Sequence, residues 1–337
     1  MLRLLLQAQV LLLLLLKLLL LLQKNNYIEN INIKSTFIGA FYVFLGALFF
    51  SGKAVLIKYM YSEVPELNHV TLLALRMGFS LPFFLLIAFF RLKKPNSSES
   101  HLDRKDQFTI IGLALFGYYL SSVFDFWGLE YVSASVERLI LFIYPTLVVV
   151  ISLVIYKRRI SKIIIIALLF AYTGIALVLG FENEQTHHLK GSILIILAAI
   201  TYASYLVGSE YMIQKLGNVL YTSIVMSLAC IFVLIDYFIR GSISILSLPV
   251  TILAQALCMA IFCTVIPSFL ISEGIKKIGS ANAAVVASIG PISTLFLANY
   301  FLGETITNIQ LLGTVLVLVG VMLISIFGKK PDPISKK

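Results

Sequence analysis

Long apolar segments separated by short polar breaks fill most of the chain. Each apolar segment is about as long as the 20 or so residues that a helix needs to cross the hydrocarbon layer of a membrane. The pattern after residue 35 therefore predicts an all-α integral membrane protein with ten transmembrane helices. The predicted segments are 36–59, 69–90, 107–126, 132–156, 161–181, 190–214, 219–239, 249–272, 280–302 and 307–327.

Composition supports a membrane protein and excludes several other classes. Hydrophobic residues make up 60% of the chain and charged residues 12%, whereas soluble domains average about 25% charged residues. The net charge of +10 is explained by basic residues flanking the helices, so we expect a lipid bilayer and no nucleic acid as partner. The three cysteines lie in apolar segments without metal-ligand spacing, and no phosphate-binding loop is present, so no cofactor is expected.

The first 35 residues are a separate problem. A leucine-rich tract carries Arg3 and Lys17 and ends in "QKNN" rather than in the small residues of a signal-peptide cleavage site. A signal-like segment, an eleventh span and an upstream extension are the alternatives. We interpret residues 1–35 as an uncleaved, low-complexity appendage.

The distribution of basic residues predicts the orientation. With the amino end of the first span placed inside, the inner loops and the tail carry sixteen lysines and arginines. The outer loops carry only Lys190 and Arg240. Because basic residues are enriched in cytoplasmic loops, both ends of the ten-helix core are expected to face the cytoplasm.

An internal repeat appears when the sequence is compared with itself at a shift of 146 residues. "GLEYVSASVERLILFIYPT" then lies over "GIKKIGSANAAVVASIGPI", which pairs Gly128 with Gly274 and Pro145 with Pro291. Under the orientation above, "GLEYVS" lies outside and "GIKKIGS" inside. We interpret the paired prolines as candidate hinges, since a proline frees a backbone carbonyl and permits a kink.

Further upstream the shift is 152 residues, and it pairs Gly39 with Gly191. The core therefore divides into two five-helix repeats, 36–181 and 190–327, followed by a basic tail at 328–337. Because five is odd, the second repeat must be inverted relative to the first. Inverted repeats with a substrate site near the midplane are a recurrent architecture of secondary transporters.

These segments resemble the EamA-type members of the drug/metabolite transporter superfamily over about residues 36–327. The strongest resemblance is "SANAAVVASIGPISTLFLANYFLGETITNIQLLGTVLVLVGVML" (280–323), with its Gly-Glu turn. "LALRMGF" (73–79) resembles the second span of that family and "YVSASVERLILFIYPTLVVVISLVIY" the fourth. The first half departs at 157–159, where Lys-Arg-Arg replaces the Gly-Glu of the family.

The resemblance implies a multi-pass carrier in a cell membrane, the bacterial inner membrane, that exports or exchanges small metabolites. It specifies no substrate, and a homodimer is left open. The rival functions are an integral-membrane enzyme and a channel or non-transporting scaffold. The loops are short and lack converging catalytic groups, which argues against the enzyme; the opposed repeats argue against the other two.

Charged residues inside the predicted spans are the candidate site. Lys53 and Arg76 lie deep in the first and second spans and should face the bundle interior, because charge exposed to lipid is costly. Glu137 and Arg138 are neighbours and point about 100° apart on a helix. Either Glu137 pairs with Lys53 or Arg76 while Arg138 reaches outward to water, or Arg138 enters the cavity as an anion contact.

Two further groups of residues complete the prediction. Tyr144 and Tyr202 are the aromatic residues that we expect along a substrate path. The remaining charges in the spans are interpreted as boundary residues near the membrane surfaces. They are Lys58, Asp125, Glu210, Asp236 and Glu273. The alternative for Lys53 and Arg76 is an internal salt bridge to Glu137 or Asp125 that fixes helix packing.

Overall fold

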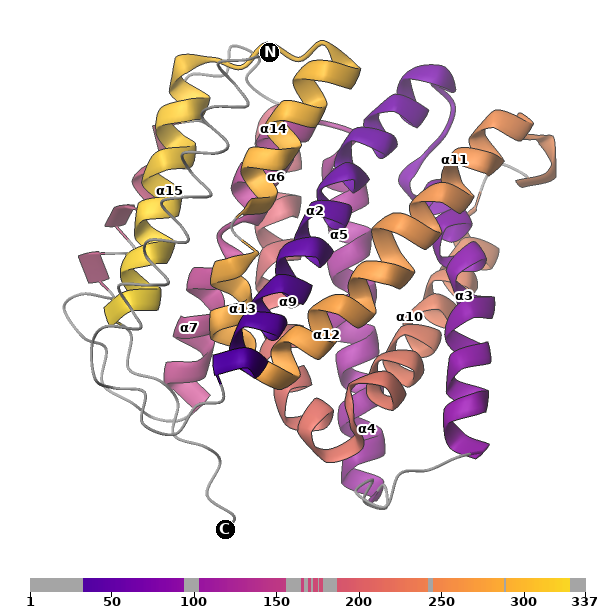
Figure 1. Ribbon diagram of the computed structural model, residues 1–337. Coiled ribbons are helices and arrows are strands. Elements are labelled where there is room, and N and C mark those ends of the chain that lie inside the picture. The colour runs from indigo at the N-terminus through magenta and orange to yellow at the C-terminus, as the bar shows by residue number, and fades with distance from the viewer. Residues whose placement is uncertain are drawn as a thin grey trace. The chain divides into compact units, whose positions relative to one another are not determined.

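The computed structural model describes residues 33–93, 103–155, 165–166, 169–170, 172–174, 176–177, 187–241, 245–287 and 289–327. Contacts divide the chain into two compact units, Met1–Ile38 and Gly39–Lys337, and the account below concerns the second. All regular structure among the described residues is helical, as predicted (Figure 1). The helices are α2 (Ile33–Glu63), α3 (His69–Lys93), α4 (Arg104–Gly112), η1 (Leu113–Tyr119), α5 (Leu120–Gly128), α6 (Ala134–Leu141), α7 (Tyr144–Ile155), α9 (His187–Leu216), α10 (Asn218–Arg240), η2 (Ile245–Ser247), α11 (Val250–Ala260), η3 (Ile261–Val265), α12 (Ile266–Ile278), α13 (Ser280–Val286), α14 (Ile289–Leu302) and α15 (Asn308–Phe327).

Eight helical stretches of the described residues are long and apolar enough to cross a membrane. Each coincides with one of the predicted segments to within a few residues. The predicted segment 161–181 falls largely outside the described residues, and α15 occupies the position of the last one. The eight are Phe37–Glu63, His69–Lys93, Arg104–Gly128, Ala134–Ile151, Leu189–Leu216, Asn218–Arg240, Val250–Ile278 and Asn282–Leu302.

The third segment of each half contains a π-helical stretch that sequence reasoning did not predict. In the first half η1 separates α4 from α5, and in the second half η3 separates α11 from α12. The two stretches end at Tyr119 and Val265, which are 146 residues apart, the shift that relates the two halves. π-Helical turns inside α-helices are frequent at functional sites because they re-aim side chains.

The fourth segment of each half is broken just before its proline. In the first half α6 ends at Leu141 and α7 begins at Tyr144, one residue before Pro145. In the second half α13 ends at Val286 and α14 begins at Ile289, two residues before Pro291. A proline lacks the N–H that a helix interior needs, and this loss costs nothing in the first turn of a new helix.

The two broken segments lie side by side and run in opposite directions. Helix α6 packs against α14, and α7 packs against α13. In Figure 1 the chain descends from α6 to α7, whereas it rises from α13 to α14. The two chain breaks therefore face each other in the middle of the unit.

The glycines of the internal repeat lie at contacts between the two halves. Each contact joins a glycine of one repeat pair to a glycine of the other pair. A Cβ atom on Gly128 in α5 would lie 3.1 Å from the carbonyl oxygen of Gly191 in α9. A Cβ atom on Gly274 in α12 would lie 3.1 Å from the carbonyl oxygen of Gly39 in α2. Small residues let helix backbones approach closely inside a membrane, where packing rather than water exclusion drives association. The third segment of each half is thereby packed on the first segment of the other.

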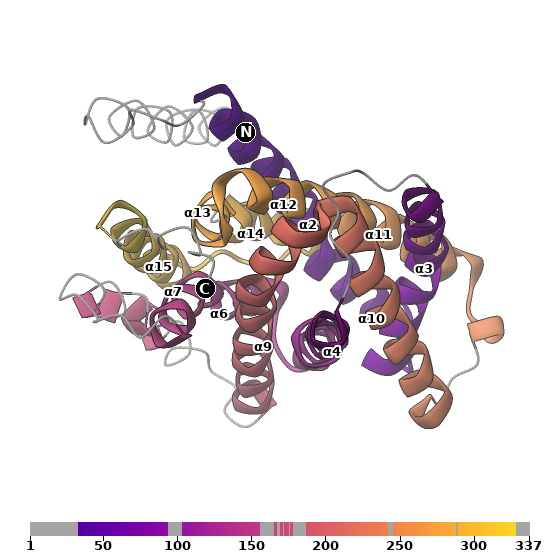
Figure 2. The ribbon, with the colours of Figure 1, turned by 90° about the horizontal axis from the view of Figure 1, so that it is seen from below.

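The second segments of the two halves also pack together. Helix α3 lies along α10, and Figure 2 shows the two side by side in a view along the helices. Their interface includes Met77 and Cys230, whose sulfur atoms are 3.8 Å apart.

A valine at position 128 should destabilise the fold, because its side chain has no room against Gly191 and Ile195. Overpacking of this kind costs about 1–3 kcal/mol. Thermal denaturation of the protein in mild detergent measures the effect. Gly112→Val in α4 is the matched control, since nothing lies within 4 Å of a Cβ atom at Gly112. Equal melting temperatures for the two variants would contradict the glycine-mediated packing.

Candidate functional site

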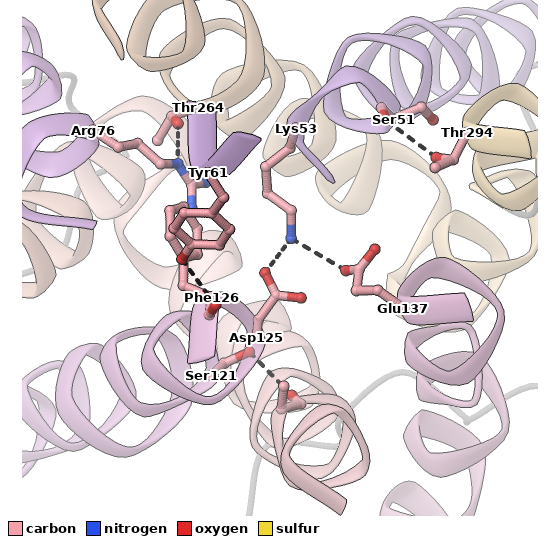
Figure 3. Close-up of polar contacts among 11 residues, drawn as sticks. Ser51, Lys53, Tyr61, Arg76, Ser121, Asp125, Phe126, Glu137, Thr264 and Thr294 are labelled. Atoms are coloured by element: carbon pink, nitrogen blue, oxygen red, sulfur yellow. Dashed lines mark hydrogen bonds and ion pairs between the residues drawn. The ribbon is translucent and has the colours of Figure 1, made fainter. Parts of the chain in front are cut away.

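The centre of the site is the ammonium group of Lys53 on α2. It donates a hydrogen bond to the Asp125 carboxylate on α5, and its Nζ lies 3.5 Å from Oε1 of Glu137 on α6. The side chains of Lys53 and Glu137 are 2% and 0% exposed. Figure 3 shows Lys53 between the two carboxylates, which approach it from different helices. One cation therefore joins three segments of the first half.

Of the two partners expected for Glu137, Lys53 is the one within ion-pair distance. The interpretation of Asp125 as a boundary residue is wrong, because its side chain is only 5% exposed and bonded to Lys53. Asp125 lies three residues before the end of α5. Position along the sequence gives depth in the membrane but not the direction a side chain faces, and Asp125 faces the bundle.

Arg76 on α3 has a hydroxyl partner rather than a carboxylate. Its Nε donates to Oγ1 of Thr264 at 2.6 Å, and Thr264 lies in the π-helical stretch η3. Its guanidinium group also lies 5.2 Å from the ring centre of Phe126. Figure 3 shows Arg76 directed to Thr264, on the far side of Lys53 from Glu137. Its Nη2 is buried and has no hydrogen-bond partner among the described residues.

Arg138 on α6 points into the bundle and does not reach outward to water. This direction agrees with the second of the two alternatives given by the sequence, in which Arg138 enters the cavity. The residue is 7% exposed, and its guanidinium group lies 5.1 Å from the ring centre of Phe50. Its Nη2 lies 2.8 Å from the place where a Cβ atom on Gly290 of α14 would be. The missing side chain of Gly290 thus makes room for Arg138. Within the described part of the chain, its buried Nε lacks a hydrogen-bond partner.

These charges line a small cavity with an aromatic wall. The cavity has a volume of about 40 Å³, which is enough for only a few water molecules. Tyr144 and Tyr202, both expected along a substrate path, line it, and their rings meet edge to face at 5.2 Å. Phe50 and Tyr118 complete the aromatic wall. Phe50 was not among the residues expected along a substrate path, although its spacing of three residues from Lys53 places both on one face of the helix.

Two glutamates bind the first N–H groups of the broken segments: Glu304 does so across the two halves, and Glu210 within the second half. At the start of α6, Glu304 accepts hydrogen bonds from the backbone N–H groups of Ala134 and Ser135, at 3.0 and 3.1 Å. At the start of α13, Glu210 on α9 accepts one from the backbone N–H of Ser280 at 3.2 Å and another from the Ser280 hydroxyl. A carboxylate is favourable there because the first N–H groups of a helix have no partner within it.

The two capped positions are equivalent in the repeat, since Ala134 and Ser280 are 146 residues apart. Figure 1 shows that α6 begins in the upper part of the unit and α13 in the lower part. The interpretation of Glu210 as a boundary residue is therefore incomplete, because it also ties α9 to α13. By contrast, Asp236 and Glu273 pair with Arg240 and Lys277 one turn away on their own helices, at 2.6 and 3.1 Å.

No group of three or more histidine, cysteine, aspartate or glutamate side chains with the geometry of a metal site occurs in the described ranges. Pro145 and Pro291 lie beside the chain breaks that flank the cavity, and Leu141, Phe142 and Ala287 from those breaks line it. Their role as hinges stays a prediction.

Replacing Lys53 by methionine should strongly destabilise the protein, because Asp125 and Glu137 would then be buried without a cation. Breaking one partner out of a buried ion pair costs about 3–5 kcal/mol. The double variant Lys53→Met/Asp125→Asn should recover part of that loss by removing the stranded charge. The yield of monodisperse protein and its melting temperature measure both effects. A Lys53→Met variant as stable as the unmodified protein would contradict the ion network.

Comparison with known proteins shows the family to which the chain belongs. The model of the EamA-like transporter family matches residues 37–180 and again 189–326. The chain is 29% identical over 291 residues to the uncharacterized transporter YcbK of Bacillus subtilis, covering 85% of this chain and 92% of that protein. It is 24% identical over 325 residues to the uncharacterized transporter sll1319 of Synechocystis, covering 88% and 95%.

A solved crystal structure has the same fold, with a TM-score of 0.62 at 14% identity over 87% of this chain and 96% of that one. Two matches to one family model account for the internal repeat read from the sequence. Together with the eight apolar helical stretches among the described residues, they show a multi-pass membrane protein of transporter type. The chain belongs to the EamA-like transporter family.

Proposed function

We propose that this membrane transporter is a secondary carrier that moves small organic metabolites by alternating access, in export or exchange. The observation that carries the proposal is the cavity around Lys53, Arg76 and Arg138. It lies where the broken segments of the two halves meet, and its charges are buried although such burial is costly. Buried charges facing a central cavity mark substrate or ion pathways in membrane proteins.

The proposal includes ten spans arranged as two inverted repeats, with both ends of the core in the cytoplasm of a bacterial cell. The opposite directions of α6–α7 and α13–α14 support inversion. The crossed glycine contacts, Gly128 with Gly191 and Gly39 with Gly274, support it as well. In transporters of this kind one half rocks against the other around a fixed central site.

The cavity volume supports a carrier that must change shape. A space of about 40 Å³ is far below the roughly 300 Å³ or more of pockets that hold a small organic ligand. The cavity must therefore widen towards one side to admit substrate. At the end where α6 begins, the contact between the halves that would part is that of Glu304 with α6, whereas the contact of Glu210 with α13 lies within the second half.

The Lys53 network gives a reason why the site could switch. Lys53 is bonded to Asp125, while both carboxylate oxygens of Glu137 lack hydrogen-bond partners among the described residues. A small displacement of α2 or α6 would change how one cation is shared between two carboxylates. We propose that this shared cation biases the carrier between its two facing states.

Metabolite profiling of cells that overproduce the protein tests transport directly. We expect at least one small metabolite to be redistributed between cells and medium relative to cells lacking the protein. Glu137→Gln should reduce that redistribution about tenfold, equivalent to ~1.4 kcal/mol on the barrier, because the second partner of Lys53 is lost. Glu273→Gln is the matched control, since Glu273 pairs only with Lys277 on its own helix in the described structure. No redistribution for any metabolite, or equal effects of the two variants, would contradict the proposal.

The orientation is tested by labelling single cysteines in intact cells with a membrane-impermeant thiol reagent. Ser98 and Asn183 lie outside the described residues, so this prediction rests on the charges of the loops. In a Cys258→Ser background, which removes the exposed native cysteine, Asn183→Cys should react and Ser98→Cys should not. The reverse pattern would invert the proposed orientation.

A further inference from the structure

We infer that the central cavity binds an organic anion, with its carboxylate or phosphate group between Arg76 and Arg138 and its apolar body against the aromatic wall. This inference names a substrate class and rests on the transporter function proposed above. The inference assigns a negative charge to the ligand of the cavity, and neither the family nor its relatives specify that charge.

The balance of buried charge is the first argument. Three cations, Lys53, Arg76 and Arg138, stand against two carboxylates, Asp125 and Glu137, and all five residues are more than nine-tenths buried. The carboxylates both approach Lys53. Within the described part of the chain, neither arginine has a carboxylate in ion-pair distance. The empty site therefore carries an excess positive charge, which a monoanion would neutralise.

Unsatisfied guanidinium nitrogens are the second argument. Nη2 of Arg76 and Nε of Arg138 are buried and find no hydrogen-bond acceptor among the described residues, although both arginines line the cavity. A buried charged donor without an acceptor raises the free energy of the protein. A ligand that supplies acceptors forms the missing hydrogen bonds and binds more tightly for that reason. Guanidinium groups are suited to carboxylate and phosphate because their N–H donors match paired oxygens.

The neighbouring helix α14 determines where the Arg138 guanidinium group lies. Its guanidinium group occupies the space that a side chain at Gly290 would fill. The same segment of α14 is tied to α2, since the Ser51 hydroxyl donates to the Gly290 carbonyl at 3.2 Å and the Thr294 hydroxyl donates to the Ser51 carbonyl at 3.1 Å. Figure 3 shows the contact between Ser51 and Thr294. A fixed backbone around a glycine therefore holds the guanidinium group at the cavity.

The rest of the lining favours an apolar or aromatic body on the anion. Phe50, Tyr118, Tyr144 and Tyr202 form the wall of the cavity. One feature points to a competing ligand: Asp125 lines the same cavity, and its Oδ1 lacks a hydrogen-bond partner among the described residues. An ammonium group could use it, so a zwitterion is the alternative that the experiment must separate. The net positive charge favours the plain anion.

Binding of matched small probes to the purified protein in lipid nanodiscs tests the inference. The probes are benzoate and phenyl phosphate as anions, benzamide as the neutral analogue, benzylammonium as the cation and phenylalanine as the zwitterion. Saturation-transfer NMR and thermal stabilisation measure binding at millimolar concentrations. We expect benzoate or phenyl phosphate to bind at least about tenfold more tightly than benzamide, and benzylammonium not to bind.

Variants tie that binding to the two arginines. Arg138→Gln and Arg76→Gln should each weaken anion binding about tenfold. Gly290→Ala should do so as well while leaving every charge in place, because it displaces only the flexible end of Arg138. Arg240→Gln is the matched control, since the Arg240 guanidinium pairs with Asp236 and is exposed. If the arginine variants fail to fold, the Gly290→Ala comparison alone decides.

Three results would overturn the inference: no anion binds, benzamide binds as well as benzoate, or anion binding is unchanged in Gly290→Ala. Phenylalanine binding about tenfold more tightly than benzoate would replace the anion by a zwitterion. Different results would contradict the transporter proposal. Transport of a neutral or cationic metabolite would contradict the anion site but not the carrier, whereas anion binding without any metabolite redistribution would contradict the carrier but not the site.

Discussion

The structure depends on a single buried cation that is shared by two carboxylates. Lys53, Asp125 and Glu137 come from α2, α5 and α6, and none of the three can be buried in an apolar surrounding without the others. This requirement fixes how the first half is assembled around the cavity. It also leaves Arg76 and Arg138 without carboxylates among the described residues, so the same network that stabilises the fold gives the cavity its excess positive charge.

The crossing of the two halves explains how the helices around the site pack closely. Glycine contacts pack α5 on α9 and α12 on α2, and close backbone packing of this kind holds helices together without buried polar bonds. The polar contact at the start of α6 joins the halves, whereas the one at the start of α13 lies within the second half. Under the carrier proposal, the interruptions beside Pro145 and Pro291 would let the parts of each broken segment move without bending a continuous helix.

Sequence reasoning predicted the membrane helices, the buried position of Lys53 and Arg76, and the pairing of glycines and prolines, because hydropathy and depth are encoded locally. It left Asp125 between a boundary residue and an ion-pair partner, and it missed the capping roles of Glu210 and Glu304 and the space that Gly290 makes for Arg138. Each of these depends on which face of a helix meets a neighbour far away in the sequence. The π-helical turns in η1 and η3, which place Tyr118 and Thr264 at the site, left no recognised signal either.

Accessibility of one cavity residue from the two membrane faces tests alternating access most directly. Ser122 lines the cavity, so Ser122→Cys in a Cys258→Ser background reports its opening to an impermeant thiol reagent in right-side-out and inside-out vesicles. We predict labelling from both faces. Glu304→Gln should raise the rate from the face where α6 begins and lower it from the other, because it weakens a contact between the halves. Glu210→Gln is the matched control and should leave the ratio of the two rates nearly unchanged, because its contact with α13 lies within the second half. Equal shifts for the two variants, or labelling from one face only, would contradict a carrier that opens alternately.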